Sequence, residues 1–199
     1  MRNKSAADDY FFGDLLMSST ASDYNYFKGL EERRIIINDI IDSDIIDKAV
    51  IPLQRFQEED PDKPIRILLN TAGGSMTDGF ALIAEIERSV APIYIEIVGV
   101  AASMGILIAM SGHNKPNVHV TCNKYAIGLL HSGSSAIRGN SDGVADTAEF
   151  NKGYEREIVR EYVLAHSAIT PELYDEKYRE QFWMQAKDML KYEIVEAVV

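Results

Sequence analysis

Two side chains in the sequence have the types and positions that nucleophilic catalysis requires. Ser103 lies in GVAASMG, where a β-branched run gives way to an apolar helical segment, so its hydroxyl is expected near helix N-terminal N–H groups. His131 ends the apolar run AIGLLH, directly before a polar segment. A serine and a histidine at two strand ends match the pairing of a nucleophile with its general base. Their structural alternatives are a helix N-cap serine and a satisfied core histidine.

A glycine turn in NTAGGSM adds backbone groups to these two side chains. Gly73 and Gly74 expose N–H groups with no side chain in the way, which suits an oxyanion hole or pairing with an extended peptide. The turn lies between a predicted strand and a predicted helix, as Ser103 does. It therefore favours the nucleophile interpretation of Ser103 over that of a plain cap.

The elements that position these residues begin near Arg34, where short β-branched runs start to alternate with helical periodicity. This alternation predicts an α/β fold with a largely parallel sheet. The expected strands are 35–37, 65–70, 93–100 and 124–131. The expected helices are a segment around 45–53 capped by Asp42 or Ser43, then 76–88, the apolar 103–112, and a long amphipathic helix over about 144–165. The last of these is too long to be only a sheet cover, so it is expected to project.

Composition limits the classes of function. A chain of 199 residues is expected to form a single domain. Twenty basic and thirty-one acidic side chains give a formal charge of −11, which disfavours nucleic acid and membrane surfaces as partners. Cys122 is the only cysteine, so no internal disulfide can form and a cytoplasmic location is expected.

The N-terminal region, residues 1–29, has no sustained period and is predicted to be a flexible arm. Its apolar cluster at 10–16 leaves two interpretations, a disordered tail or a segment that neighbouring subunits order. Acidic residues interrupt the apolar ones, so neither a signal-peptide core nor a spanning helix is predicted. Residues 30–199 are then the folded domain.

The aspartates of DIIDSDIID raise a calcium-loop alternative. The glycine and the terminal glutamate of an EF-hand loop are absent, and helix capping explains Asp42 and Asp44. No metal-ligand spacing and no phosphate-binding glycine loop appears elsewhere. We therefore expect no metal and no bound cofactor in this chain.

Three motifs, NTAGGSMTDG, GVAASMG and LLHSGSS, occur together and in one order. In this they resemble the proteolytic subunits of the Clp protease family (ClpP, peptidase family S14), and the resemblance covers about 30–199. It implies the ClpP/crotonase fold of repeated β-β-α units with a projecting handle helix at about 144–165. It also implies a serine endopeptidase, with Ser103 as nucleophile, His131 as base, and the amides of Gly74 and Met104 as the oxyanion hole.

The resemblance further implies that a peptide substrate is held as an added β-strand between two segments. The first segment follows the glycine turn and the second follows the strand-end histidine. The residues expected to bind substrate are Gly73, Ser75, Met76, Thr77, Ser132, Gly133, Ser134 and Ser135.

The third position of the catalytic triad departs from the family. The family places an aspartate shortly before an aromatic-rich stretch, where QFWMQAKDM has Gln181. Glu180 is the adjacent substitute, Asp175 and Glu176 are more distant ones, and Gln181 itself can accept a hydrogen bond from the histidine. Because a triad without its carboxylate keeps part of its activity, slow but real hydrolysis is predicted.

Partners also follow from the resemblance. It implies two stacked heptameric rings, a tetradecamer interlocked by the handle helices, with residues 1–29 as an axial gate. A Clp-type ATPase unfoldase is expected to use ATP and to deliver unfolded polypeptides. Arg66 and Leu68 stand where family members often expose aromatic side chains to an ATPase loop, so an altered docking surface is expected.

Two other functions are compatible with parts of the sequence. A catalytically weak or inactive regulatory subunit, assembled with an active paralogue, is favoured by the missing aspartate and disfavoured by the presence of both Ser103 and His131. An acyl-CoA enzyme of the crotonase type shares the general architecture and uses glycine-turn amides as an oxyanion hole. The placement of the serine and the histidine argues against that second alternative.

Overall fold

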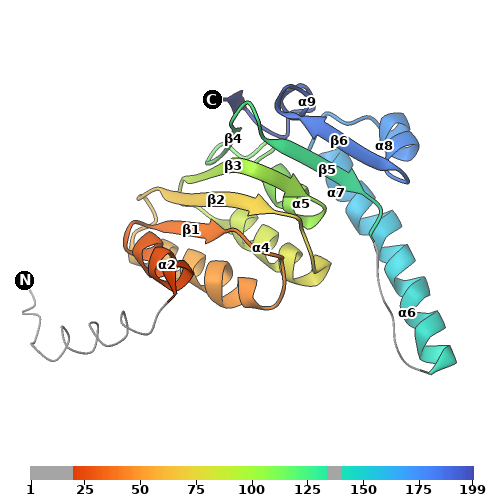
Figure 1. The fold of residues 1–199 in the computed structure, drawn as a ribbon, viewed down its shortest axis with the longest axis horizontal. Coiled ribbons are helices and arrows are strands. Elements are labelled where there is room, and N and C mark those ends of the chain that lie inside the picture. Colours follow the sequence, from red (N-terminus) through yellow and green to blue (C-terminus); the bar gives the residue numbers. More distant parts are fainter. Residues whose placement is uncertain (1–19, 134–139) are drawn as a thin grey trace, which may run out of the picture.

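The computed structural model describes residues 20–133 and 140–199, which are built around a seven-stranded sheet (Figure 1). The strands β1, β2, β3, β4 and β7 follow one another in parallel, and β5 leaves this order to pair with β3 and β6. This confirms the predicted α/β class with a largely parallel sheet. The strands are β1 (Arg34–Ile37), β2 (Ile65–Thr71), β3 (Ile93–Ala102), β4 (Val118–Cys122), β5 (Ile127–His131), β6 (Gln181–Gln185) and β7 (Ala197–Val198).

The sheet divides at β3. The first half of this strand, from Ile93 to Ile97, pairs with β4, whereas its end, from Val100 to Ala102, pairs with β5. β5 then pairs with β6 in antiparallel register. The ends of β3 and β5 consequently lie side by side, and the residues that follow them meet at one edge of the sheet.

Helices cover the sheet and extend from it. Helix α5 packs on α4 and on β3, and the long α6 extends away from the sheet (Figure 1). The helical segments are α2 (Ala21–Glu31), the π-helical turn η1 (Ile46–Val50), α3 (Ile51–Glu59), α4 (Met76–Arg88), α5 (Met104–Met110), α6 (Ser141–Tyr154), the π-helical turn η2 (Glu155–Val159), α7 (Arg160–Ala165), α8 (Pro171–Lys177) and α9 (Ala186–Lys191).

The hydrophobic core lies between the sheet and the helices that cover it. Along β2 and most of β3 buried residues such as Ile67 and Ile95 alternate with more exposed ones, as in a sheet with one covered face. α5 is buried along its whole length, which agrees with its apolar sequence. This burial fixes the first residue of α5, Met104, relative to the end of β3.

The long helix predicted over about 144–165 is present and begins slightly earlier. It runs from Ser141 to Ala165 as three joined segments, α6, η2 and α7. α6 contains no buried residue, whereas Val159 and Val163 are buried at the other end of the helix. One half of the helix is therefore anchored on the domain and the other half projects from it.

The N-terminal boundary differs from the prediction, because helix α2 lies inside the region 1–29 that was expected to be a flexible arm. Thr20 and Asp23 form a capping box: the Asp23 N–H donates to Thr20 Oγ1 at 3.3 Å, and the Thr20 N–H donates to the Asp23 carboxylate at 2.9 Å. Such a cap stabilises a helix start that has little hydrophobic periodicity. The rest of the predicted arm, 1–19, lies outside the described residues.

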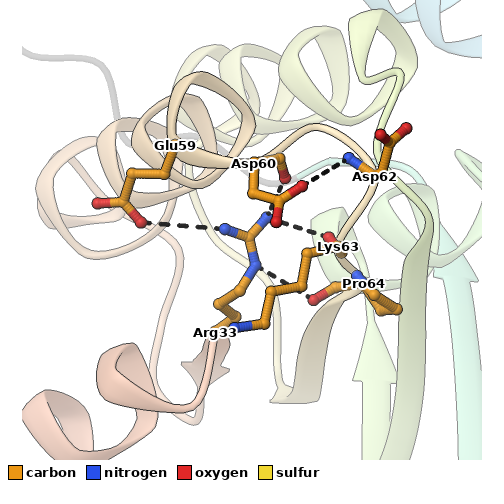
Figure 2. Close-up of polar contacts among 6 residues, drawn as sticks. All are labelled: Arg33, Glu59, Asp60, Asp62, Lys63 and Pro64. Carbon is orange, nitrogen blue, oxygen red and sulfur yellow. Dashed lines mark hydrogen bonds and ion pairs between the residues drawn. The ribbon is translucent and has the colours of Figure 1, made fainter.

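A buried arginine fixes the passage from α2 into β1 (Figure 2). Arg33 is 5% exposed and has a φ of 54°. Its guanidinium donates hydrogen bonds to the carbonyl oxygens of Asp60 and Lys63, each at 3.0 Å, and of Pro64 at 3.3 Å. The Glu59 carboxylate lies 3.9 Å from Nη1. We call this group of five residues the Arg33 junction, and it ties the linker before β2 to the start of β1.

Candidate active site

Ser103 occupies a sharp turn between β3 and α5. Its φ of 54° and ψ of −120° are unusual for a residue with a side chain, and such strain is common where a catalytic residue is presented. Its N–H donates to the carbonyl oxygen of Leu129 in β5 at 2.8 Å, which holds the turn against the neighbouring strand. The hydroxyl forms no cap bond to α5. The plain N-cap interpretation of Ser103 therefore does not hold.

His131 is the last residue of β5 and is half-buried. Its ring nitrogen Nδ1 lies 2.6 Å from the carbonyl oxygen of Ser132. Because a carbonyl oxygen only accepts hydrogen bonds, Nδ1 carries the proton in this arrangement. The other nitrogen, Nε2, then has a free lone pair, as a general base requires.

Ser103 and His131 line one cavity of about 570 Å³, together with Gly73 and Gly74. We call this cavity the Ser103 cleft. The structure thus brings the two side chains to the same side of the sheet, although no hydrogen bond joins them in it. The apolar part of the lining is formed by Ile40, Met76, Leu107, Leu130 and Val159.

The glycine turn lies directly against Ser103. A Cβ atom on Gly73 would lie 2.5 Å from the carbonyl oxygen of Ala102 and 2.8 Å from the backbone nitrogen of Met104, and φ is 95° at Gly73 and 152° at Gly74. Only glycine fits such a position. No hydrogen bond of the Gly74 N–H is found among the described residues, and Met104 is in the first turn of α5, where N–H groups lack helical partners.

The backbone beside the glycine turn is already paired on one side. Ile41 donates to the Gly73 carbonyl at 2.8 Å and accepts from the Ser75 N–H at 2.7 Å, which makes a short parallel bridge centred on Gly74. The Ser75 hydroxyl caps α4 through the Asp78 N–H. These bonds hold the turn rigidly beside Ser103.

The residues predicted to bind substrate fall into three groups. Gly73, Ser75, Met76 and Gly133 line the Ser103 cleft. Thr77 contacts the Ser75 hydroxyl at 3.1 Å, while Ser132 is held by its N–H, which donates to the Tyr178 carbonyl at 2.8 Å. The remaining two, Ser134 and Ser135, lie outside the described residues.

No hydrogen bond or ion pair joins the His131 side chain to a residue proposed for the third triad position. Gln181 lies opposite His131 in the β5–β6 register, but its side-chain oxygen accepts from the Trp183 indole N–H at 3.1 Å. The Glu180 carboxylate has no hydrogen bond or ion pair within the described part of the chain. Both distant substitutes are paired elsewhere, Asp175 with Arg160 at 3.0 Å and Glu176 with Lys177 at 2.7 Å.

The cleft also contains a carboxylate, that of Glu155, which the sequence alone did not single out. Glu155, at the start of η2, lines the Ser103 cleft with His131, and its carboxylate lies against the backbone of Gly133. Burial raises the pKa of Glu155, while the Gly133 N–H and the charge of His131 act in the opposite direction. No motif in the sequence marks this residue, because it lies on the handle helix, far along the chain from both catalytic candidates.

Within 20–133 and 140–199 no group of three or more His, Cys, Asp or Glu side chains is arranged to hold a metal ion. No helix in the same ranges is both long and apolar enough to cross a bilayer.

Comparison with known proteins agrees with this geometry. The family model described as Clp protease matches residues 18–199. The ATP-dependent Clp protease proteolytic subunit 2 of Rhodococcus jostii is 28% identical over 178 residues, which covers 89% of each chain. The protein of the same name from Nocardia farcinica is 27% identical over 189 residues, covering 93% of this chain and 91% of its own. With nearly its whole length matched, the chain belongs to the Clp protease family.

Proposed function

We propose that this chain is a serine endopeptidase subunit in which Ser103 attacks peptide bonds with His131 as its base. One observation carries the proposal: an uncapped serine hydroxyl on a strained turn shares a cleft with an imidazole whose Nε2 is free. This is the pairing that activates a serine nucleophile.

The steps follow from the groups around Ser103. His131 Nε2 accepts the hydroxyl proton as Oγ bonds to the scissile carbonyl carbon, and the carbonyl oxygen becomes an oxyanion that the Gly74 and Met104 amides stabilise. The imidazolium then protonates the leaving amine, which leaves an acyl-enzyme. Water, deprotonated by His131, releases the second product. Because Ser103 and His131 are not hydrogen-bonded here, the first step requires a side-chain adjustment that brings Oγ and Nε2 together.

The substrate of the proposed reaction is an unfolded polypeptide bound in an extended form. The apolar lining of the Ser103 cleft, which includes Leu107 and Val159, favours a mild preference for apolar side chains. We propose no cofactor or metal for the hydrolysis itself. ATP would be used by a Clp-type unfoldase that delivers the polypeptide.

We also propose that the chain assembles into two stacked heptameric rings, and the projecting helix supports this part of the proposal. The location that we propose for the particle is the cytoplasm. α6 has no buried residue, and the aromatic ring of Phe150 is left 68% exposed on the single chain. Ile158, in η2, is 43% exposed. Apolar side chains on a projecting helix are typical of a surface that another subunit covers.

The experiment that tests the proposed function is hydrolysis of casein or a short fluorogenic peptide by the purified assembly. We expect slow cleavage that Ser103→Ala abolishes. Absence of cleavage by the wild-type assembly, or equal cleavage by the wild-type and Ser103→Ala proteins, would contradict the proposal, since Ser103 would then not act as the nucleophile.

A second function, that of a catalytically weak regulatory subunit, is favoured by a specific observation. None of the four side chains proposed for the third triad position forms a hydrogen bond or ion pair with the His131 side chain, and three of them are paired elsewhere. Under this alternative the chain would assemble in mixed rings with an active paralogue. Native mass spectrometry of the particle from its host separates the two, because rings of a single subunit mass would exclude a purely regulatory role.

A further inference from the structure

We propose that the two tasks of a triad carboxylate are divided in this protein between the Ser132 carbonyl, which orients His131, and Glu155, which supplies the negative charge. The inference rests on the proposed function of Ser103 and His131 and names a positioning residue for that reaction. A triad carboxylate normally does both: it fixes the tautomer and orientation of the imidazole, and it stabilises the imidazolium that forms during catalysis.

The orientation task is met by the backbone. The Ser132 carbonyl oxygen is 2.6 Å from His131 Nδ1, and the Ser132 N–H is itself held by the Tyr178 carbonyl at 2.8 Å. The acceptor is thus fixed to the segment that follows α8. A neutral carbonyl selects the tautomer with a proton on Nδ1, but it brings no full negative charge to offset the imidazolium.

The position of Glu155 allows its carboxylate to supply the negative charge that stabilises the imidazolium. Its carboxylate lies against the backbone of Gly133, two residues from His131, where an added Cβ atom would collide with Glu155 Oε1. Both Glu155 and His131 line the Ser103 cleft and interact electrostatically. Glu155 is also the first residue of the π-helical turn η2, a local irregularity that often marks a functional position in a helix.

The other titratable groups packed around Glu155 do not take over this role. Tyr174 of α8 and Tyr178 face the carboxylate, and burial raises the pKa of Tyr178 to about 12 and raises that of Tyr174 as well, so both are neutral near pH 7. Arg160, one turn further along the helix, is held by both oxygens of Asp175 at 3.0 Å. His131 is then the ionisable group of the cleft whose charge Glu155 most directly affects.

The test compares Glu155→Gln with the wild-type assembly by the rate at which a fluorophosphonate labels Ser103 between pH 5 and pH 9. Glutamine has nearly the same shape and can still accept hydrogen bonds, but it carries no charge. We expect the maximal rate to fall about 10-fold, because the imidazolium loses its counter-charge. We also expect the acid limb of the profile to move to lower pH, because removing a nearby negative charge disfavours the protonated imidazole.

The matched control is Glu157→Gln, which removes the same charge from an exposed position two residues further along the helix. We expect its profile to overlay that of the wild type. Gly133→Ala is a second variant of the contact, since the added methyl displaces the Glu155 carboxylate; it is expected to reproduce the shift of Glu155→Gln. A Glu155→Gln profile that keeps the wild-type acid limb would overturn the inference, whatever its maximal rate.

A second readout does not depend on catalysis and separates failure of the inference from failure of the proposed function. Carbethoxylation of His131 by diethyl pyrocarbonate, followed by peptide mass spectrometry across the same pH range in the Ser103→Ala background, reports the protonation of the imidazole directly. Adding Glu155→Gln should move the midpoint to lower pH. An unmoved midpoint would refute the role of Glu155, while absence of fluorophosphonate labelling with a moved midpoint would refute only the hydrolase function.

Discussion

At the Arg33 junction the guanidinium donates to three carbonyl oxygens, whereas in the Ser103 cleft the hydroxyl of Ser103 and the N–H of Gly74 have no partner among the described residues. Both regions contain a non-glycine residue with φ of 54°, Arg33 in one and Ser103 in the other. In the first region, satisfied hydrogen bonds hold the strained backbone. In the second, the strain presents groups that are free to bind something else.

The Arg33 junction and the Ser103 cleft thus have different tasks: the first stabilises the fold, and the second provides the groups proposed for catalysis. Unpaired polar groups cost free energy when they are buried, so they are expected where a ligand completes them. The bridge between Ile41 and the glycine turn and the buried helix α5 hold the cleft groups in place without occupying them. Substitutions in the cleft should therefore reduce activity more than stability, and substitutions at the Arg33 junction should do the reverse.

Among the variants that test this difference between the two regions, Ser103→Ala is expected to cause the largest loss of activity. Removing the nucleophile should lower peptide hydrolysis by at least about 10³-fold, to the level that positioning and the oxyanion hole alone provide. The midpoint of urea unfolding should stay within error of the wild type or rise slightly, because a strained position loses no hydrogen bond. Loss of stability comparable to the loss of activity would break the contrast.

Gly74→Ala should give the next largest effect. The new Cβ would collide with the carbonyl oxygen of Ile41 at a φ of 152°, so the amide that we propose as an oxyanion donor would be displaced. Loss of one such donor lowers turnover by about 10²-fold or more. Gly153→Ala on α6 is the matched control, since nothing lies within 4 Å of the added methyl; its kinetics should be those of the wild type. Unchanged turnover in Gly74→Ala would remove this amide from the mechanism.

Arg33→Ala should do the reverse and lower stability without lowering activity. Three carbonyl oxygens lose their donor in a buried setting, which is expected to lower the free energy of unfolding by about 2–3 kcal/mol, measured by urea at one protein concentration. Lys28→Ala breaks only a half-exposed ion pair with Glu31 and should leave the free energy of unfolding within error of the wild type. Turnover per folded subunit should be unaffected in both. A catalytic defect in folded Arg33→Ala would show that the two regions are coupled.

The smallest effect is expected from Gln181→Ala. This residue is opposite His131 in the β-ladder, but its side chain is engaged by Trp183 and not by the imidazole. Turnover should therefore fall by no more than about threefold, well short of the cost of losing a triad carboxylate. A loss near 10²-fold, measured with the same fluorogenic peptide, would return Gln181 to the third triad position and weaken the division of tasks proposed for Ser132 and Glu155.

Local patterns predicted much of this molecule. The apolar periodicity of 76–88 predicted α4 at its observed bounds, and the strand-to-helix change at Ser103 predicted the turn that presents it. What depends on pairing between distant segments was not predictable in the same way. β6 has little period-2 signal of its own and becomes a strand because β5 offers it an edge, and β4 is likewise absent from the predicted strands.

The role of Glu155 was likewise not predictable from local sequence patterns. In the sequence Glu155 is one of several charged residues on a long amphipathic helix, where a glutamate is normally solvated. It reaches the cleft because the start of η2 and the end of β5 both line this cavity, and because Gly133 leaves room for its carboxylate. The alternatives weighed for the third triad position were all close to Gln181 in sequence, whereas the charge in the cleft comes from another element.

The most direct test of the account is the intact mass of the assembled particle after reaction with a fluorophosphonate, for the wild type and for His131→Ala. We expect one adduct per reactive subunit, mapped to Ser103, with labelling slowed by at least about 10²-fold in His131→Ala. Absence of an adduct in the wild-type particle, or labelling of Ser103 at the same rate without the imidazole, would contradict the claim that Ser103 and His131 act together.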